Sequence, residues 1–401
     1  MTAPPIEDPP SVLDSLPPSA WQLAHPDLVE AEFWRIVRNT VALVIRKGGA
    51  GKTTKLALLA DALSRMGLNV LVIDTDPQGN TSDAFGCEVQ LVPDGTDRLT
   101  GKPKLTPDRF TVGDVIASAE PGVAGRAIQP AKWNDMRLPD AAWDRGGPLD
   151  GHYGVVGIIP CFESIENDAM TWTPADLYNL RTTLATAPAG EVPPNVRWDV
   201  VLIDTPPGGT NIGRQACLAA HHCLLVTNAE PFGMKAVPKT LTFIDDIRFN
   251  YQHPSFSAIG LVLNEFIPTS VENKEQIAGF EELQALGRAA SGTQTDAPGA
   301  AQTGEEAPAP NREEVPPEVL RLAEIMEWPA RMANRTVVPR SQSYQAPMSR
   351  LLAMSDNREA ATVLCQASEL NALRLLDEIG HPRAAEIRAL WSTKWPTKKA
   401  S

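Results

Sequence analysis

Short runs of apolar residues recur along the chain, and polar or turn-forming residues bound them. Such runs, rich in Val, Ile and Leu, are typical of strands that are buried on both faces in a parallel sheet. Helical periodicity follows several of them, most clearly at residues 55–65. We therefore predict an α/β fold with a doubly wound, mostly parallel sheet. The runs lie at residues 41–46, 69–74, 153–160, 200–204, 223–227 and 258–264.

Stretches without this pattern predict where the chain departs from a compact domain. Residues 1–25 are proline-rich and predict a disordered N-terminus, followed by one domain over residues 26–401. Residues 289–317 contain almost no large apolar side chain, which predicts a disordered acidic loop between two helices. The predicted insertions and a basic helical tail lie at about residues 87–110, 131–150, 271–330 and 380–401.

The composition is that of a folded protein from a reducing compartment. The 401 residues are 43% hydrophobic, which is enough for a full α/β core. The five cysteines form no C-x-x-C pair, which favours the cytosol and argues against a disulfide framework or a zinc ribbon. No apolar run reaches the ~18–20 residues of a transmembrane helix, and the acidic, proline-rich N-terminus is unlike a signal peptide.

The net charge of −13 is unevenly distributed, so it does not exclude a nucleic-acid partner. Residues 271–330 carry twelve acidic and four basic side chains, whereas residues 331–401 carry eleven basic and six acidic ones. The acidic loop and the basic C-terminal region are therefore different surfaces. On charge alone, the candidate phosphate contacts in the basic region are Arg331, Arg335, Arg340 and Arg350.

The segment Lys47–Thr54 has the sequence of a phosphate-binding loop. An apolar run precedes it and a helical pattern follows it, which is the context that such a loop requires. Its glycines let backbone N–H groups approach phosphates, and the following helix adds its dipole. We expect Lys52 to reach the β- and γ-phosphates of ATP, and Thr53 to complete a Mg²⁺ shell. The expected nucleotide contacts of the loop are Gly48, Gly49, Ala50, Gly51, Lys52, Thr53 and Thr54.

Carboxylates follow two other predicted strands. Asp74 and Asp76 come at the end of the run 69–74, and Asp204 ends the run 200–204. The carboxyl ends of parallel strands meet at one edge of a sheet, which is where ligands bind in such folds. An apolar strand that ends in Asp204 has the form of a Walker B segment, which places a carboxylate beside the Mg²⁺ shell. These positions predict a P-loop NTPase fold with ATP and Mg²⁺ as ligands.

The glycine-rich segment also resembles one particular group of P-loop proteins. With its leading Lys47, the segment Lys47–Thr54 resembles the "deviant Walker A" loop of the ParA/MinD ATPases. The segment Asp74–Asn80 resembles the ParA sequence word for word, and Asp204 with the following Thr-Pro-Pro-Gly resembles the switch segment of the group. The resemblance recurs from residue 41 to about residue 347, roughly three quarters of the chain.

The resemblance implies roles for individual residues. Lys47 would reach across a dimer interface to the phosphates held by the partner subunit. Asp76 would orient or activate the attacking water, and Asp74 would support the Mg²⁺ shell.

Three later positions carry weaker implications of the same resemblance. Glu230 would contact the nucleotide of the partner subunit, and Pro339 would pack beside the adenine. Asn264 would read the adenine edge, since an amide offers both a donor and an acceptor. The alternative for Asn264 is an ordinary turn residue at the end of a strand.

As a whole, the resemblance implies a nucleotide-switched homodimer that sandwiches two Mg-ATP molecules. Hydrolysis would be slow and stimulated by a ParB-type centromere-binding partner. The ATP-bound dimer would bind DNA non-specifically and segregate a plasmid or chromosome on the nucleoid in the cytoplasm. The ParA-like form of Asp74–Asn80 favours DNA over a membrane as the surface.

Three alternatives stay open at this point. A MinD-like membrane-associated positioning ATPase is suggested by the basic tail at 380–401, in which an apolar stripe of Ile387, Leu390 and Trp391 shares one helical face. That tail could also contact DNA or pack on the body of the protein.

A nucleotide-gated electron donor of the nitrogenase iron-protein type would need cysteines beside the switch segments, where Cys217 is the nearest. A non-catalytic adaptor would bind nucleotide without hydrolysis, which the set of Lys47, Lys52, Thr53, Asp76 and Asp204 disfavours.

Overall fold

The structure is a computed structural model of the 401-residue chain, and it describes most of the residues. The predicted N-terminal disorder, most of the predicted acidic loop, Arg335, Pro339 and Arg340 lie outside them. The described residues are 39–96, 101–118, 123–136, 148–149, 151–185, 198–264, 269–291, 315–323, 325, 327–328, 330–331, 345–353 and 358–394.

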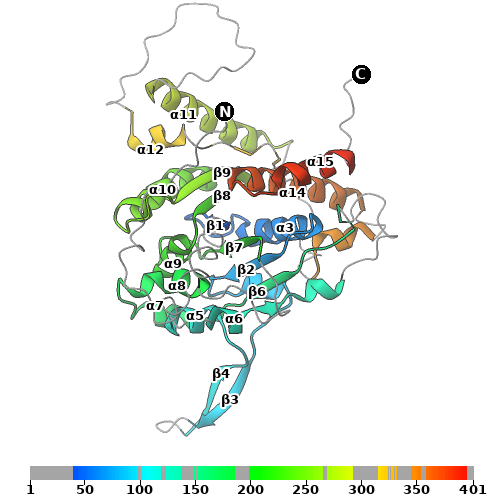
Figure 1. Ribbon diagram of the computed structural model, residues 1–401. Coiled ribbons are helices and arrows are strands. Elements are labelled where there is room, and N and C mark those ends of the chain that lie inside the picture. The colour runs from blue at the N-terminus through cyan, green and yellow to red at the C-terminus, as the bar shows by residue number, and fades with distance from the viewer. Residues whose placement is uncertain are drawn as a thin grey trace, which may run out of the picture.

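A seven-stranded sheet forms the centre of the molecule, in the order β5-β6-β2-β7-β1-β8-β9 (Figure 1). Its six long strands are parallel, and only the short β5 at one edge pairs antiparallel with its neighbour. Every predicted apolar run forms one of the parallel strands. This arrangement confirms the doubly wound, mostly parallel α/β fold. The strands are β1 (Thr40–Val44), β2 (Val70–Asp74), β5 (Gln129–Pro130), β6 (Val156–Ile159), β7 (Val200–Asp204), β8 (His222–Asn228) and β9 (Ser257–Asn264).

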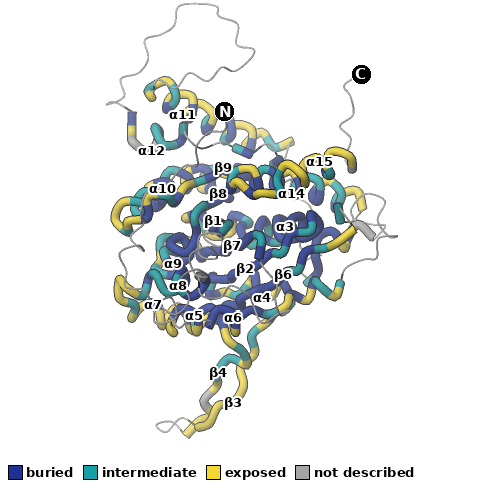
Figure 2. Tube along the Cα trace, in the orientation of Figure 1, coloured by how far each residue is buried: buried dark blue, intermediate teal, exposed yellow. Residues whose placement is uncertain are grey.

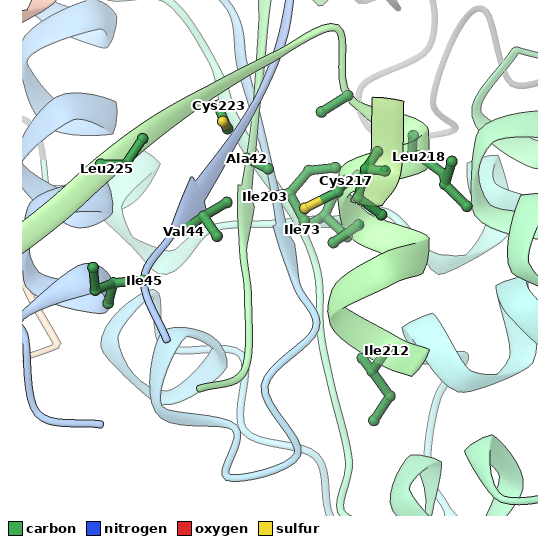
Figure 3. Close-up of a cluster of buried hydrophobic side chains, with 14 of the residues drawn as sticks. Ala42, Val44, Ile45, Ile73, Ile203, Ile212, Cys217, Leu218, Cys223 and Leu225 are labelled. Carbon is green, nitrogen blue, oxygen red and sulfur yellow. The ribbon is translucent and has the colours of Figure 1, made fainter. Parts of the chain in front are cut away.

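Two apolar layers cover the sheet, one on each face. Successive residues of a strand point to opposite faces, so Ala42 and Val44 of β1 join one layer, while Val41 and Leu43 join the other. Figure 3 shows part of the first layer, where Cys217 lies near Ile203 and Ile73. The first layer packs against α5 (Val112–Ser118), α6 (Val123–Ala127), α7 (Ile165–Ala169), α8 (Asn179–Ala185), α9 (Asn211–Ala219) and α10 (Pro231–Phe249). The second packs against α3 (Lys52–Arg65), α14 (Arg358–Glu378) and α15 (Ala384–Lys394).

The C-terminal helices are part of the body. On α15, the side chains of Ile387 and Trp391 are buried against the second apolar layer. The indole N–H of Trp391 donates to Glu369 Oε2 of α14, and the other oxygen of Glu369 accepts from the buried Arg65 of α3. The apolar stripe that suggested a membrane-bound tail therefore packs on the protein, as far as residue 394. None of the helices in the described part of the chain combines the length and the apolar character needed to cross a membrane.

The three predicted insertions have different structures. In the first, β3 (Leu91–Thr96) and β4 (Pro103–Pro107) pair as an antiparallel hairpin that projects from the body, with every residue of β3 exposed (Figures 1 and 2). In the second, Trp133 is buried and stacks on Phe85, so the start of this stretch belongs to the core rather than to a surface excursion. In the third, α11 (Val271–Ser291) and α12 (Pro317–Leu322) pack together, and Gln284 of α11 donates to the carbonyl of Leu322.

The remaining short elements connect these parts. The helix α4 (Asn80–Ala84) follows β2, and three 3₁₀ turns lie at Lys132–Met136, Asp176–Tyr178 and Met348–Ala353. The last of these turns is anchored to α3, because Asp61 accepts hydrogen bonds from the backbone and the hydroxyl of Ser349.

His253 is a buried histidine that makes stability depend on pH. Its ring donates from Nε2 to the carbonyl of Ala220 and stacks on Phe256. Burial, and next the charge of Arg181, lowers the pKa of His253 to about 3, from 6.5 in an unfolded chain. Between these values the unfolded chain binds a proton that the folded chain does not, so acid destabilises the fold.

We therefore expect His253→Gln, which retains a donor for Ala220, to flatten the loss of stability below pH 6.5. The difference between the variant and the wild type should change by about 1.4 kcal/mol per pH unit between pH 6 and pH 4.5, the value for one proton. Urea unfolding at several pH values measures this difference. Parallel curves for the two proteins would show that His253 is not held neutral.

Candidate nucleotide-binding site

The loop between β1 and α3 has the conformation that its glycines make possible. Gly49 and Gly51 have φ angles of 71° and 78°, in the left-handed region where residues with a Cβ are disfavoured. Gly51 has a second constraint, because a Cβ there would lie 1.7 Å from Nδ2 of Asn264. The amide group of Asn264 donates to the carbonyl oxygens of Ala50 and Gly51, at 3.4 and 3.3 Å. Asn264, at the end of β9, therefore braces the loop, and its contact with adenine stays a prediction.

This loop forms one wall of a cavity of about 1130 Å³ at the carboxyl edge of the sheet. Six of the seven loop residues predicted to contact nucleotide line it, together with Asp76. The opposite walls come from α4, α7 and the start of α9. The lining residues are Gly48, Gly49, Ala50, Gly51, Lys52, Thr53, Asp76, Pro77, Gln78, Asn80, Asp83, Ala84, Glu88, Glu166, Ala169, Met170, Pro206, Pro207, Thr210, Asn211, Ile212, Arg214 and Gln345.

Lys52 carries a positive charge into the cavity at the N-terminus of α3. It is the first residue of this helix, and only 7% of its side chain surface is exposed. Burial lowers the pKa of Lys52, and the nearby carboxylates of Asp204 and Asp76 oppose this change. An ammonium group and a helix N-terminus that face one cavity together favour a phosphate ligand.

Asp204 ends β7 beside the loop and has one oxygen without a partner. Its Oδ2 accepts hydrogen bonds from the hydroxyls of Thr53 and Thr81, both at 2.6 Å. Its Oδ1 is buried and has no hydrogen-bond partner. Burial raises the pKa of Asp204, while Lys52 and the two hydroxyls lower it. An unpaired buried carboxylate oxygen beside a hydroxyl is a donor set that suits Mg²⁺, so these residues fit the predicted ion.

Both carboxylate oxygens of Asp74, on the neighbouring strand, accept hydrogen bonds from protein groups. Oδ1 accepts from the backbone N–H of Asp76, and Oδ2 accepts from the backbone and the hydroxyl of Ser82 in α4. Burial, and next the charge of Asp204, raises the pKa of Asp74 to about 8. Asp74 thus holds α4 and Asp76 in place, and its support of a Mg²⁺ shell stays a prediction. Sequence reasoning missed Thr81 and Ser82, although both directly follow the Asp74–Asn80 segment that it singled out.

Asp76 lies where a carboxylate can act on a ligand in the cavity. Its backbone is fixed by Asp74, and its Oδ1 accepts from the backbone N–H of Gln78 at 3.1 Å. The side chain is partly exposed and lines the cavity together with Lys52. The position allows the predicted role as the residue that orients water.

Lys47 turns away from the cavity toward α10. Its ammonium group donates to Asn228 Oδ1 and to Glu230 Oε2, both at 3.2 Å. The ion pair with Glu230 is open to solvent, since 55% of the Glu230 side chain surface is exposed. In this conformation Lys47 and Glu230 bind each other within one subunit, and their contacts with a partner subunit stay predictions.

The remaining candidates are distributed over the surface. Arg331 forms ion pairs with Glu327 and Glu281, so its charge is already neutralised. Arg350 is exposed on the last 3₁₀ turn. Cys217 is fully buried on α9, and burial raises its pKa far above that of a free thiol. Among the described residues, no cluster of His, Cys, Asp or Glu has the arrangement of a metal site made by these residues alone.

The fold and this site together define a P-loop nucleotide-binding protein. Residues 41–292 match the CobQ/CobB/MinD/ParA nucleotide-binding domain. The chain belongs to this family and is a ParA-type member of it.

Individual relatives agree with this assignment. The chain is 26% identical over 228 residues to the chromosome-partitioning ATPase Soj of Thermus thermophilus. The matched region covers 56% of this chain and 69% of that protein. It is 23% identical over 210 residues to the maintenance of carboxysome distribution protein A of Synechococcus elongatus, covering 52% and 65% of the two chains. Among solved structures, that of Cyanthece apo McdA shares the fold with a TM-score of 0.52 and 17% identity, over 82% of this chain and 98% of that one.

Proposed function

We propose that this protein is a partition ATPase, which hydrolyses ATP slowly and uses the reaction to segregate DNA. The observation that carries the proposal is that a phosphate-binding loop, with Thr53, lines one cavity together with Asp76. Thr53 also donates to Oδ2 of Asp204, whose Oδ1 has no partner. A protein that only bound nucleotide would need the loop but not an acidic residue at the position of Asp76.

The residues at the phosphate end of the cavity have different roles in the proposed reaction. The loop N–H groups and Lys52 bind and orient the phosphates, which is the main catalytic requirement of phosphoryl transfer. Thr53 and Asp204 would hold Mg²⁺, and the bound ion would supply positive charge to neutralise the phosphates. Asp76 orients the attacking water, and Asp74 positions Asp76 through its backbone N–H.

Dimerisation would complete the site. In the proposed ATP-bound homodimer, Lys47 leaves Asn228 and Glu230 and reaches the phosphates in the partner subunit. Glu230 is then released to contact the nucleotide of the partner. Because the Lys47–Glu230 pair is exposed, breaking it requires only about 0.2–1 kcal/mol, which a new contact with phosphate can supply.

The proposed surface for the dimer is DNA, and the proposed stimulating partner is a ParB-type protein. The relation to Soj, a chromosome-partitioning ATPase, supports this choice. The proposed location is accordingly the nucleoid in the cytoplasm. The relation to a carboxysome distribution protein leaves the identity of the cargo open. The MinD-like alternative depended on the apolar stripe of the C-terminal tail, and Ile387 and Trp391 of that stripe are buried.

The test is a DNA-binding titration of the wild type and Lys47→Ala with ATP, with ADP and without nucleotide. We expect binding to duplex DNA only with ATP, a steep loss of affinity with salt, and no binding by the variant. Fluorescence anisotropy at several salt concentrations measures this, with Lys274→Ala on the exposed side of α11 as the matched control. Binding that is independent of nucleotide, or absent in the wild type, would contradict the partition role while leaving the ATPase assignment intact.

A further inference from the structure

The outer side of α10 carries two lysines that no acidic residue neutralises. Lys235 and Lys239 are exposed and lie four residues apart, so they share one face of the helix. Within the described part of the chain, neither ammonium group forms an ion pair or a hydrogen bond. Although the net charge of the protein is −13, these two lysines make this face of the helix locally positive.

A third cation extends this face toward the nucleotide loop. Arg46 is exposed, and its backbone N–H donates to the hydroxyl of Thr240 in α10 at 3.1 Å. Its guanidinium lies over Gly209, where a Cβ would come within 3.4 Å of Nη2. Arg46 therefore joins the loop, the segment after Asp204 and α10 at one point. We call Arg46, Lys235 and Lys239 the α10 surface.

The nearby acidic residues do not cancel these charges. Asp245 accepts from Arg321 of α12 at 2.6 Å, and Asp246 lies 3.8 Å from Arg214 of α9. Both carboxylates are thus paired with arginines of the neighbouring helices. The three cations of the α10 surface are exposed. Figure 2 shows α10 on the outside of the molecule, between α12 and α9.

The α10 surface is connected to the nucleotide cavity. A hollow of about 540 Å³ beside it is lined by Arg46, Gly209 and Thr242, and by the paired carboxylates Asp245 and Asp246. Arg214 lines both this hollow and the nucleotide cavity. A change in the segment that follows Asp204 would therefore reach Arg46 through direct contacts.

We infer that the α10 surface binds the phosphate backbone of duplex DNA. Lysines four residues apart on a helix have Cβ atoms about 6 Å apart, so both ammonium groups can contact neighbouring phosphates of one strand. Apolar side chains are exposed only at the two ends of this helix face, at Phe232 and Phe249, which is too little apolar area to favour insertion into a lipid surface. This inference rests on the proposed function, because it names the residues by which the ATP-bound form contacts DNA.

The test compares Lys235→Ala/Lys239→Ala with the wild type in full-length protein. We expect the double variant to bind ATP normally but to bind duplex DNA at least about ten-fold more weakly, with the slope of log affinity against log salt reduced by about 2. Lys274→Ala/Arg288→Ala on α11 is the matched control, since it removes the same charge from another helix and should leave the slope unchanged.

The outcomes separate this inference from the proposed function. A wild type that binds no DNA with ATP would contradict the proposed function itself. A wild type that binds DNA, with an unchanged slope in the Lys235/Lys239 variant, would overturn only the assignment of the surface. Binding to vesicles of anionic lipid that is lost in the variant, while DNA binding persists, would overturn the assignment in favour of a membrane.

Discussion

Asp204→Asn is expected to slow ATP hydrolysis strongly and, at the same time, to stabilise the nucleotide-free protein. Asparagine has the same shape and keeps one oxygen to accept from Thr53 and Thr81, but it removes the negative charge that would hold Mg²⁺. Hydrolysis should fall by about 10²–10³-fold, which is typical when one electrostatic contact to a transition state is lost. The removed charge is buried and has an unpaired oxygen, and burial raises the pKa of Asp204 although Lys52 lowers it. Loss of this charge should therefore stabilise the fold by about 1–2 kcal/mol.

Phosphate release and thermal unfolding of the same preparation measure the two effects together. Asp94→Asn, on the exposed hairpin, is the control and should change neither. If Asp204→Asn lost activity and stability together, the carboxylate would hold the fold rather than the metal. If it kept its activity, Asp204 would not be the metal ligand.

Lys55→Met is expected to stabilise the folded protein substantially. The side chain of Lys55 is fully buried on α3, and its ammonium group has no hydrogen-bond partner. Burial lowers the pKa of Lys55 to about 7. Methionine has a similar length and no charge, so it should stabilise the folded protein by about 2–4 kcal/mol at pH 7.

The pH dependence gives this prediction a second readout. The folded chain disfavours the proton on Lys55, whereas the unfolded chain keeps it up to about pH 10.5. The penalty is therefore complete below pH 7 and shrinks as the pH rises, so the gain from Lys55→Met should be smaller at pH 9 than at pH 7. Urea unfolding at both values measures it, with Lys274→Met as the exposed control, which should stay within about 0.5 kcal/mol of the wild type. Equal stability of Lys55→Met and the wild type would mean that Lys55 has a partner in solution.

Much of the fold and of the site could be predicted because the responsible signals are local. An apolar run followed by polar residues identifies a buried strand and its carboxyl end, and such ends meet at one edge in a parallel sheet. For this reason Lys52, Thr53 and Asp76 were predicted to lie together, and they line one cavity. The strand and its carboxylate at Asp204 follow from the same reasoning.

What could not be predicted depends on contacts between distant parts of the sequence. Nothing near Asn264 indicates that its amide group faces the carbonyl of Gly51, since the two residues are 213 positions apart. The interaction of Lys47 with Glu230 has the same origin. Periodicity predicted the stripe of Ile387 and Trp391 correctly, but a stripe has the same spacing whether it packs on DNA, a membrane or the protein itself.

The contact between α3, the first helix of the nucleotide site, and α14 affects the order in which the protein folds during synthesis. Arg65 of α3 binds Glu369, which lies 304 residues later, and Figure 1 shows α3 beside α14 and α15. At about 5–20 residues per second, a ribosome needs roughly 15–60 s to travel that distance. During this time the guanidinium of Arg65 and the apolar side of α3 have none of their C-terminal cover. The first helix of the nucleotide site therefore leaves the ribosome early but receives its full apolar cover only after α14 and α15 have been made.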